Sequence, residues 1–184
     1  MKFLPQVIPD VILIKPTLHG DDRGYFAETF RQDLFNNAID GNINFIQENV
    51  SKSSKGVLRG LHYQVEPFSQ SKLLKVIQGA VLDVVVDIRK SSPTFGQHLS
   101  FELTADNKCQ LFVPKGFAHG FIVLSDTATF NYKVDSYYAP DYERGIAYND
   151  ENLKINWQLK SEIFKLSKKD LNNPTLANVK DLLD

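Results

Sequence analysis

Length, composition and charge indicate one globular domain of ordinary size. The chain has 184 residues, 42% of them hydrophobic and 23% charged, which is the balance of a soluble folded protein. Its 21 basic and 22 acidic residues give a net charge of −1, so the composition gives no reason to expect nucleic acid as a partner. The single cysteine, Cys109, cannot form an internal disulfide and fits a reducing compartment. No apolar run has the length of a signal peptide or a membrane span, so we expect a cytoplasmic protein with no membrane partner.

The first third of the chain is predicted to consist of short strands, turns and one helix. In chain order, the pattern predicts a strand over 7–14 interrupted at Pro9, a turn over 19–24, a strand over 25–30, a short helix over 31–38, a strand over 45–51 and a polar loop over 51–55. Alternation puts Gln47 and Asn49 on one face of their strand. A bulge at Gly24 would bring Arg23 and Glu28 together.

The chain from residue 56 to residue 134 is predicted to be almost entirely strands and turns. The pattern indicates a strand over 56–64, a loop over 66–70, two strands over 71–88 joined near Gly79, a turn over 91–96, a strand over 99–103, a strand–turn–strand over 109–124 and a strand over 127–134. Short strands at this spacing are typical of a sandwich or barrel. We therefore expect a mainly β protein.

Only residues 161–184 favour helix, with an interruption at 172–174. The chain contains no internal repeat, low-complexity tract or linker. These features predict a single domain over 1–184, with a barrel core over about 20–158 and a C-terminal helical segment over about 159–184.

The stretch GVLRGLHYQ at residues 56–64 sets an arginine and a histidine in an apolar, glycine-punctuated strand. Regular alternation puts Gly60, His62 and Gln64 on one face and Arg59 on the other. If the first face lines a cavity, His62 is a titratable group inside it. The glycines let the backbone bend or be approached closely.

Two histidines, His62 and His119, are candidates for a metal site or for acid–base chemistry. For either one alone, a buried and hydrogen-bonded histidine is the simpler interpretation. The residues around each resemble the two cupin motifs, but Gln64 and Val123 stand where further ligands are usual. Two of four ligands remain, and an amide is a poor substitute for imidazole. We predict a cupin barrel without a metal, in which both histidines are available for proton transfer.

Eight stretches together carry a more specific resemblance. They are DRGYFxE (22–28), QENxS (47–51), LRGLHYQ (58–64), KLxxVxxG (72–79), DxxVDIR (83–89), PxGFAHGF (114–121), YKxxxYY (132–138) and SxKD (167–170). In residue types and order they resemble the dTDP-4-dehydrorhamnose 3,5-epimerases. The resemblance implies a cupin jelly roll with short C-terminal helices and no cofactor. It also implies inversion at C3 and C5 of dTDP-4-dehydro-6-deoxy-D-glucose to give dTDP-4-dehydro-L-rhamnose, a step of dTDP-rhamnose biosynthesis.

That chemistry needs a base, an acid and a group that stabilises an enolate, because both protons lie alpha to the 4-keto group. The resemblance assigns His62 as the base, Tyr132 as the acid on the opposite face and Lys72 as the cation near the enolate oxygen. Asp170 would orient His62 and stabilise its imidazolium. Considered locally, each has a plainer interpretation, since residues 167–170 also form a helix-start motif, and strand tyrosines and lysines are common.

Asp83 is unusual because it shares a strand face with Val81 and Val85. The resemblance implies that this carboxylate supports the region of the catalytic histidine. It also implies that His119 lies beside the substrate rather than acting as the base.

The resemblance further implies a nucleotide site. Arg23 and Arg59 would bind the diphosphate, Gln47 and Asn49 the base and ribose, and Glu28 the imide N–H of the base. The remaining expected substrate contacts are His19, Tyr138, Glu143 and Lys169, and His19 stands where many relatives carry an aromatic side chain. Part of this site would come from a neighbouring subunit, which implies a homodimer.

Arg59 and His62 raise a question of geometry, since they are three positions apart and a regular strand points them to opposite faces. Either Gly60 permits a local twist that brings both to one substrate, or Arg59 reaches the site of the neighbouring subunit.

Other functions fit parts of the pattern. They are a mono-epimerase at C3 or C5, a 3,4-ketoisomerase, a non-catalytic cupin that binds a sugar nucleotide, and a metal-dependent dioxygenase. A binding protein has no need of a phenol opposite His62, so Tyr132 favours an enzyme.

Overall fold

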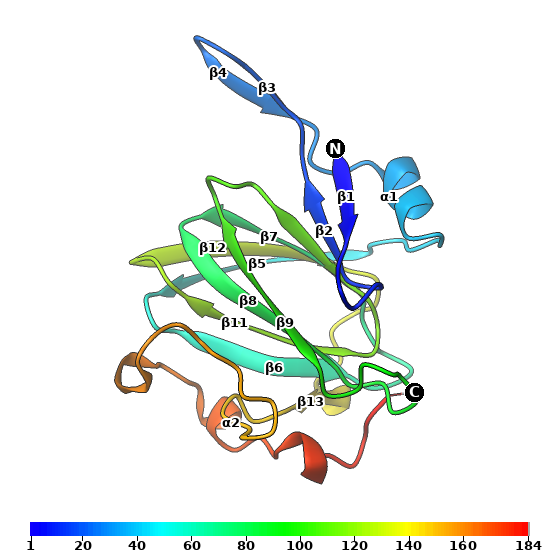
Figure 1. Ribbon diagram of the computed structural model, residues 1–184, viewed down its shortest axis with the longest axis vertical. Helices are drawn as coiled ribbons and strands as arrows, with labels where there is room; N and C mark the ends of the chain where they lie inside the picture. Colours follow the sequence, from blue (N-terminus) through cyan, green and yellow to red (C-terminus); the bar gives the residue numbers. More distant parts are fainter. Residues whose placement is uncertain (184) are drawn as a thin grey trace.

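Two antiparallel sheets face each other in the computed structural model, which describes residues 1–183 (Figure 1). The first sheet has six strands in the order β1 (Lys2–Pro5), β2 (Ile12–Lys15), β10 (Gln110–Val113), β7 (Lys72–Gln78), β12 (Thr127–Val134) and β5 (Gln47–Ser54). The second has five in the order β13 (Glu143–Gly145), β6 (Leu58–Gln64), β11 (Phe117–Val123), β8 (Ala80–Asp87) and β9 (His98–Thr104). This is the mainly β cupin jelly roll that the sequence predicts.

A hairpin of β3 (Leu18–Asp21) and β4 (Gly24–Ala27) extends away from the body of the molecule (Figure 1). The helix α1 (Gln32–Ala38) follows it and packs on the outer face of the first sheet. There the buried Phe35 meets Phe112 edge-on, with 5.1 Å between ring centroids. The predicted helix over 31–38 is confirmed, with Arg31 at its N-cap.

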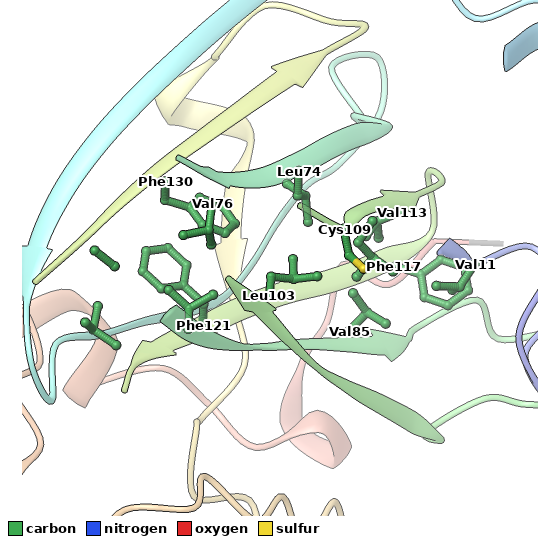
Figure 2. Close-up of a cluster of buried hydrophobic side chains, with 14 of the residues drawn as sticks. Val11, Leu74, Val76, Val85, Leu103, Cys109, Val113, Phe117, Phe121 and Phe130 are labelled. Carbon is green, nitrogen blue, oxygen red and sulfur yellow. The ribbon is translucent and has the colours of Figure 1, made fainter. Parts of the chain in front are cut away.

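The main hydrophobic core lies between the two sheets (Figure 2). Leu74 and Val113 enter it from the first sheet, and Val85 and Phe121 from the second. Burial of side chains of this size contributes about 1.5–3 kcal/mol each. Phe121 stacks on Phe130 with 4.5 Å between centroids, and both rings also line a cavity between the sheets. The core therefore forms the floor of that cavity.

A second core covers the outer face of the second sheet. Leu61 and Ile122 of the sheet pack there with Ile146, Trp157 and Leu176 of the chain that follows β13. Because β8 is thus buried on both faces, its residues form a nearly continuous apolar run rather than an alternating one. The same packing brings the C-terminal segment against β6.

The predicted strands are largely confirmed, and the strand over 127–134 coincides with β12. The interrupted strand expected over 7–14 is confirmed over 12–14, which belong to β2, and is wrong over 7–11, because residues 6–11 form a turn between β1 and β2. Gln6 N–H donates to Val11 O across this turn, which contains Pro9. The polar loop expected from residue 51 is also wrong, since β5 continues to Ser54 and pairs with β12 throughout.

The C-terminal segment is less helical than expected. It contains the helix α2 (Lys168–Leu171) and two single 3₁₀ turns, Ser161–Ile163 and Leu176–Asn178. Separate apolar side chains anchor the segment to the sheet, so no continuous helical face is required. Within residues 1–183, no helix is long and apolar enough to cross a membrane. The single-domain organisation over 1–184 stays a prediction, and its last residue lies outside the described chain.

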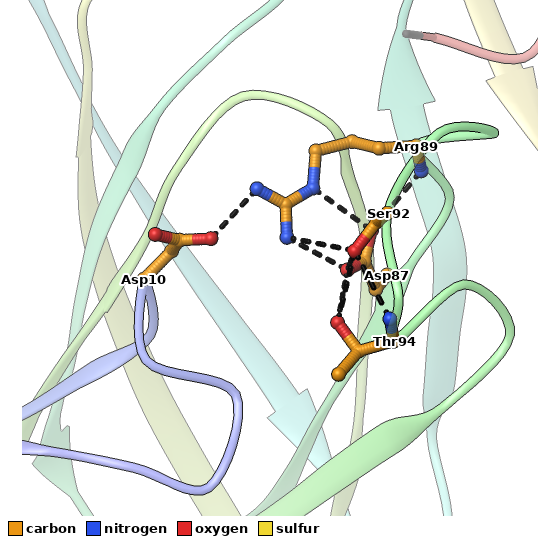
Figure 3. Close-up of polar contacts among 5 residues, drawn as sticks. All are labelled: Asp10, Asp87, Arg89, Ser92 and Thr94. Carbon is orange, nitrogen blue, oxygen red and sulfur yellow. Dashed lines mark hydrogen bonds and ion pairs between the residues drawn. The ribbon is translucent and has the colours of Figure 1, made fainter.

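A buried carboxylate ties the N-terminal turn to the loop after β8 (Figure 3). Asp87, whose side chain is fully buried, accepts hydrogen bonds from Arg89 (2.7 and 2.9 Å), Ser92 (2.6 Å) and Thr94 (2.6 Å). Arg89 also reaches Asp10 at 2.7 Å. Burial alone would raise the pKa of Asp87, but these donors outweigh it and lower the pKa to about 2.

Asp87→Asn tests this cluster. The folded-state pKa of about 2 lies below the value of about 3.9 for an unfolded aspartate, so the carboxylate stabilises the fold above about pH 4 and loses its contribution as the pH falls towards 2. We expect the variant to unfold with about 2 kcal/mol less free energy at pH 7. In urea denaturation, this deficit should shrink from pH 5 to pH 2.5. A deficit that stays constant over that range would contradict the account, and Asp106→Asn, on an exposed turn, is the control.

Candidate active site

A cavity of about 260 Å³ lies between the two sheets, above the stacked rings of the main core. Strands from both sheets and the loops before β7 and after β12 line it. The predicted site residues that line it are Arg59, His62, Lys72, His119, Tyr132, Tyr138 and Glu143. Seven side chains that the sequence analysis predicts to contact the substrate therefore line one cavity.

A bulge in β6 brings Arg59 and His62 to the same cavity. On β11, His119 pairs with His62 and Phe121 pairs with Arg59, so three steps along β6 match two along β11. Of the two possibilities open from the sequence, the local twist is therefore present within one subunit.

Gly60 makes the bulge possible. Its φ of +128° is a conformation that other residues rarely adopt. A side chain there would also meet the carbonyl oxygen of His119 at 2.8 Å, because the backbones of β6 and β11 approach closely at Gly120.

His62 is paired with a carboxylate from the far end of the chain. Its Nε2 lies 2.5 Å from Oδ1 of Asp170, which is 4% exposed. Ser167 accepts the backbone N–H of Asp170 at 3.1 Å and donates its hydroxyl to Oδ2 at 2.7 Å. Asp170 is therefore both part of the helix start and the partner of His62. Burial raises the pKa of Asp170, but the hydrogen bonds from His62 and Ser167 outweigh it and lower the pKa, so the carboxylate stays charged.

This contact determines which nitrogen of His62 is available to a ligand. A carboxylate accepts hydrogen bonds, so Nε2 carries the proton and Nδ1 keeps its lone pair. Nδ1 lies 3.9 Å from Oε1 of Glu143. The imidazole side chain is 26% exposed, which leaves it accessible from the cavity.

His119 forms a second, deeper pair with Asp83. The His119 Nε2 atom lies 2.8 Å from Asp83 Oδ2, and the Asp83 side chain is fully buried. Burial lowers the pKa of His119 and raises that of Asp83, although each group partly offsets the shift of the other. The structure thus places Asp83 against His119, whereas His62 has its own carboxylate.

Lys72 and Tyr132 face the same cavity from neighbouring strands of the first sheet. Burial lowers the pKa of Lys72 to about 8, with Asp83 and Glu143 acting in the opposite direction. Burial raises the pKa of Tyr132, so its phenol holds its proton at neutral pH. The cavity therefore holds a cation and a phenol beside two imidazoles.

A polar rim consists of Tyr138 and Glu143, which line the cavity, and of Gln47, Asn49 and Lys169, which hydrogen bonds and an ion pair link to them. Glu143 accepts the hydroxyl of Tyr138 at 2.6 Å and forms an ion pair with Lys169. Gln47 accepts the backbone N–H of Tyr138 at 3.1 Å and donates to Asn49 at 2.9 Å. The predicted shared face of Gln47 and Asn49 is confirmed by their pairing and by the alternating burial of β5.

Three predicted residues lie away from this cavity in the described chain. His19 and Arg23 lie on the projecting hairpin, where Arg23 forms an ion pair with Asp21. The register of β3 and β4 is regular up to Gly24, so the expected bulge is absent from this hairpin. Glu28 lines a separate cavity on the outer face of the first sheet.

Sequence reasoning missed several residues of the site. Ser51, Gln70, Phe121 and Phe130 also line the cavity. Gln64, considered only as a substitute for a metal ligand, is buried and holds two loops together. Its amide donates to Phe68 O and Tyr137 O and accepts from the N–H of Ala139. Strand alternation placed Gln64 on the cavity side, but its loop partners are distant in sequence.

Among residues 1–183, no cluster of three or more His, Cys, Asp or Glu side chains is arranged to hold a metal ion. The two imidazoles that the cupin motifs supply each bond a single carboxylate instead. The absence of a cofactor stays a prediction.

Comparison with known proteins gives a consistent result. A family model described as dTDP-4-dehydrorhamnose 3,5-epimerase matches residues 5–178. A curated dTDP-4-dehydrorhamnose 3,5-epimerase from Shigella flexneri is 50% identical over 172 residues, which is 94% of each chain.

Solved structures are similar over nearly the whole fold. The dTDP-4-dehydrorhamnose 3,5-epimerase of Elizabethkingia anophelis NUHP1 is 44% identical with a TM-score of 0.94, over 97% of both chains. The dTDP-6-deoxy-D-glucose-3,5-epimerase of Legionella pneumophila Philadelphia 1, solved in complex with dTDP-4-keto-L-rhamnose, is 43% identical with a TM-score of 0.95. That match covers 99% of this chain and 97% of the other.

Gly60→Ala tests the geometry of the β6 bulge. The added methyl group meets the backbone of β11, and the positive φ adds strain, so we expect the free energy of unfolding to fall by more than about 2 kcal/mol. Gly41→Ala is the matched control, because its nearest neighbour is the flexible Ile39 side chain at 3.4 Å; it should change stability by less than about 0.5 kcal/mol. Equal stability of the two variants in thermal or urea denaturation would contradict this role of Gly60.

Proposed function

The chain belongs to the dTDP-4-dehydrorhamnose 3,5-epimerase family, and from this membership we propose the chemistry of its cavity. The protein is an isomerase that inverts C3 and C5 of dTDP-4-dehydro-6-deoxy-D-glucose to give dTDP-4-dehydro-L-rhamnose. The observation that carries the mechanism is the His62–Asp170 pair, at 2.5 Å, in the same cavity as the phenol of Tyr132. One base and one acid at a single cavity are what inversion alpha to a ketone requires.

We assign proton abstraction to Nδ1 of His62. With Nε2 held by Asp170, this nitrogen has a lone pair directed away from the carboxylate. When it takes the proton from C3 or C5, the electron pair moves to the C4 oxygen as an enolate. The charged Asp170 then stabilises the imidazolium, as the carboxylate does in a catalytic triad.

Tyr132 is the proposed proton donor on the opposite face of the sugar. Burial keeps its phenol protonated, so it can return a proton to the carbon and complete the inversion. Lys72 is proposed to stabilise the enolate oxygen. With a pKa of about 8, its ammonium form predominates at pH 7, and it can offer a charged donor to the developing oxyanion.

The buried His119–Asp83 pair is proposed to contact the sugar without taking its protons. Burial disfavours the charged form of His119, so this imidazole suits hydrogen bonding to a hydroxyl group better than the storage of a proton. Asp83 supports it by accepting its Nε2–H.

The nucleotide is proposed to bind at the polar rim. Arg59 lines the cavity and is suited to the diphosphate. Tyr138 also lines the cavity and connects through hydrogen bonds to Gln47 and Asn49. Glu143 and Lys169 form the neighbouring wall.

We also propose a homodimer in which the projecting hairpin completes the site of the other subunit. This accounts for His19, Arg23 and Glu28, which lie away from the cavity of their own subunit. The hairpin exposes Tyr25 and Phe26, at 61% and 69%, and large exposed apolar side chains on an extended arm favour burial against a partner. A cytoplasmic location is proposed in addition, because the reduced thiol of Cys109 suits a reducing compartment.

Two variants test the assignment of base and acid. In deuterated water, the wild type should convert the ketosugar nucleotide and acquire deuterium at C3 and C5. His62→Asn should lose both exchange and inversion, by a factor on the order of 10²–10⁴. Tyr132→Phe should keep exchange through His62 but lose inversion to a similar extent.

The readout is carbon-resolved NMR of the sugar. Wild-type exchange at one carbon alone would indicate a mono-epimerase, and a keto group that changes position would indicate a ketoisomerase. Binding without any exchange would indicate a non-catalytic cupin. Unchanged turnover in Tyr132→Phe would exclude Tyr132 as the acid.

Mixed dimers test the shared site. His62→Asn and Arg23→Ala subunits should each be poorly active alone. When the two are co-expressed and purified together, the intact core of one subunit meets the intact hairpin of the other, so activity should recover. A monomer in light scattering, or no recovery in a mixed dimer, would contradict the proposal.

A further inference from the structure

Two successive inversions by one base and one acid leave a proton balance to restore. After the first inversion His62 holds an extra proton, and Tyr132 lacks one. The second inversion needs both groups in their starting states while the nucleotide sugar is still bound. A path that connects His62 to solvent without passing the substrate would meet this need; the argument rests on the proposed function.

Among the ion pairs within residues 1–183, the carboxylate that lies within 4 Å of Nδ1 of His62 is that of Glu143. Its Oε1 lies 3.9 Å from Nδ1. That separation exceeds a hydrogen bond, and a small side-chain rotation or one bridging water would close it. The other nitrogen of His62 is occupied by Asp170, so a proton gained at Nδ1 faces Glu143 directly.

One carboxylate oxygen of Glu143 is positioned to accept a proton from His62. Its Oε2 takes the hydroxyl of Tyr138 at 2.6 Å and the ammonium of Lys169, which leaves Oε1 directed towards His62. Burial raises the pKa of Glu143, but the contacts with Lys169 and Tyr138 outweigh it and lower the pKa, so the group is a carboxylate at neutral pH. Its side chain is 15% exposed.

Glu143 also lies between two cavities and lines both of them. One is the active-site cavity, and the other is a cavity of about 340 Å³, here called the rear cavity. The other residues that line the rear cavity are Arg144, Gly145, Lys169, Asn173, Pro174 and residues 178–181. Across the described chain Glu143 is the only residue that lines both cavities. The Lys169 side chain, 49% exposed, lines the rear cavity but not the active-site cavity, so the rear cavity reaches solvent at a residue outside the substrate pocket.

We propose that Glu143 relays the proton from His62 into this rear cavity between the two inversions. The relay is a role in addition to any contact of Glu143 with the nucleotide sugar. It acts through His62 and does not touch the reacting carbons.

The proton steps balance. In each inversion one C–H bond breaks, with its proton on His62 Nδ1 and its electron pair on the C4 oxygen, and one C–H bond forms with the proton of Tyr132. In the reset, the N–H bond of the imidazolium breaks as an O–H bond forms on Glu143, which then releases the proton to water in the rear cavity. Tyr132, left as phenolate, takes one proton from solvent, so the net change is zero.

Glu143→Gln removes the acceptor but keeps the shape. With the ketosugar nucleotide in deuterated water, the second inversion should slow by about tenfold or more relative to the first inversion of the same variant, whatever the loss of binding common to both steps. The singly inverted, singly deuterated sugar should therefore accumulate in NMR spectra. Added imidazole buffer, a small proton carrier, should restore the second step in proportion to its concentration. Glu151→Gln, on an exposed turn, is the matched control and should resemble the wild type.

The outcomes separate the hypotheses. No exchange by the wild type would overturn the proposed function and this inference with it. Normal wild-type exchange with Glu143→Gln slowed equally at both carbons, a raised KM and no response to imidazole would mean that Glu143 only binds substrate, and would overturn the relay alone. Wild-type behaviour of Glu143→Gln would also overturn it.

A second variant leaves Glu143 in place. Asn178 lies on the exposed rim of the rear cavity, and Asn178→Trp adds bulk that fills it. We expect the same accumulation of the singly inverted sugar, again relieved by imidazole. An unaffected ratio of the two steps, with the cavity shown to be filled in a crystal structure of the variant, would contradict an exit through this route.

Discussion

The contact between His62 and Asp170 is the interaction on which the site depends. It joins β6 to a helix more than a hundred residues later in the chain, and it requires that the C-terminal segment pack on the outer face of the second sheet. Ser167 holds the carboxylate on its other side. The second hydrophobic core thus has a chemical consequence, because it brings Asp170 to Nε2 of His62 and leaves Nδ1 accessible from the cavity.

The two histidine–carboxylate pairs differ in depth rather than in kind. His119 and Asp83 are both buried, and desolvation opposes a charge on the imidazole. His62 is partly exposed to the cavity, and its carboxylate remains charged. Proton abstraction creates an imidazolium, so it suits the His62–Asp170 pair better than the His119–Asp83 pair. The bulge at Gly60 then adds Arg59 to the same cavity, beside the residues proposed to contact the sugar.

The strand pattern could be predicted from sequence, because alternation and glycine-rich turns are local signals. Most cavity residues could be predicted only through the resemblance to a known family, since local reasoning gave each of them a plainer interpretation. Features that depend on distant parts of the chain could not be predicted from local signals. Residues 167–170 look like a helix start whether or not Asp170 meets His62, and Gln64 gives no sign of the loops that it joins. The polar composition of residues 51–55 predicts a loop, yet β12 pairs with β5 as far as Ser54, and Ser53 is buried. The hairpin residues lie apart from the cavity because one chain contains only its own half of the proposed shared site.

The central claim is that Asp170 fixes the tautomer of His62 and leaves Nδ1 as the base. Nitrogen-15 NMR of the histidine ring nitrogens at pH 8 measures this directly, with His62→Asn used to assign the signals among the four histidines. The account predicts a protonated Nε2 and an unprotonated Nδ1 for His62, and loss of this preference in Asp170→Asn. A His62 ring protonated at Nδ1 in the wild type would contradict it.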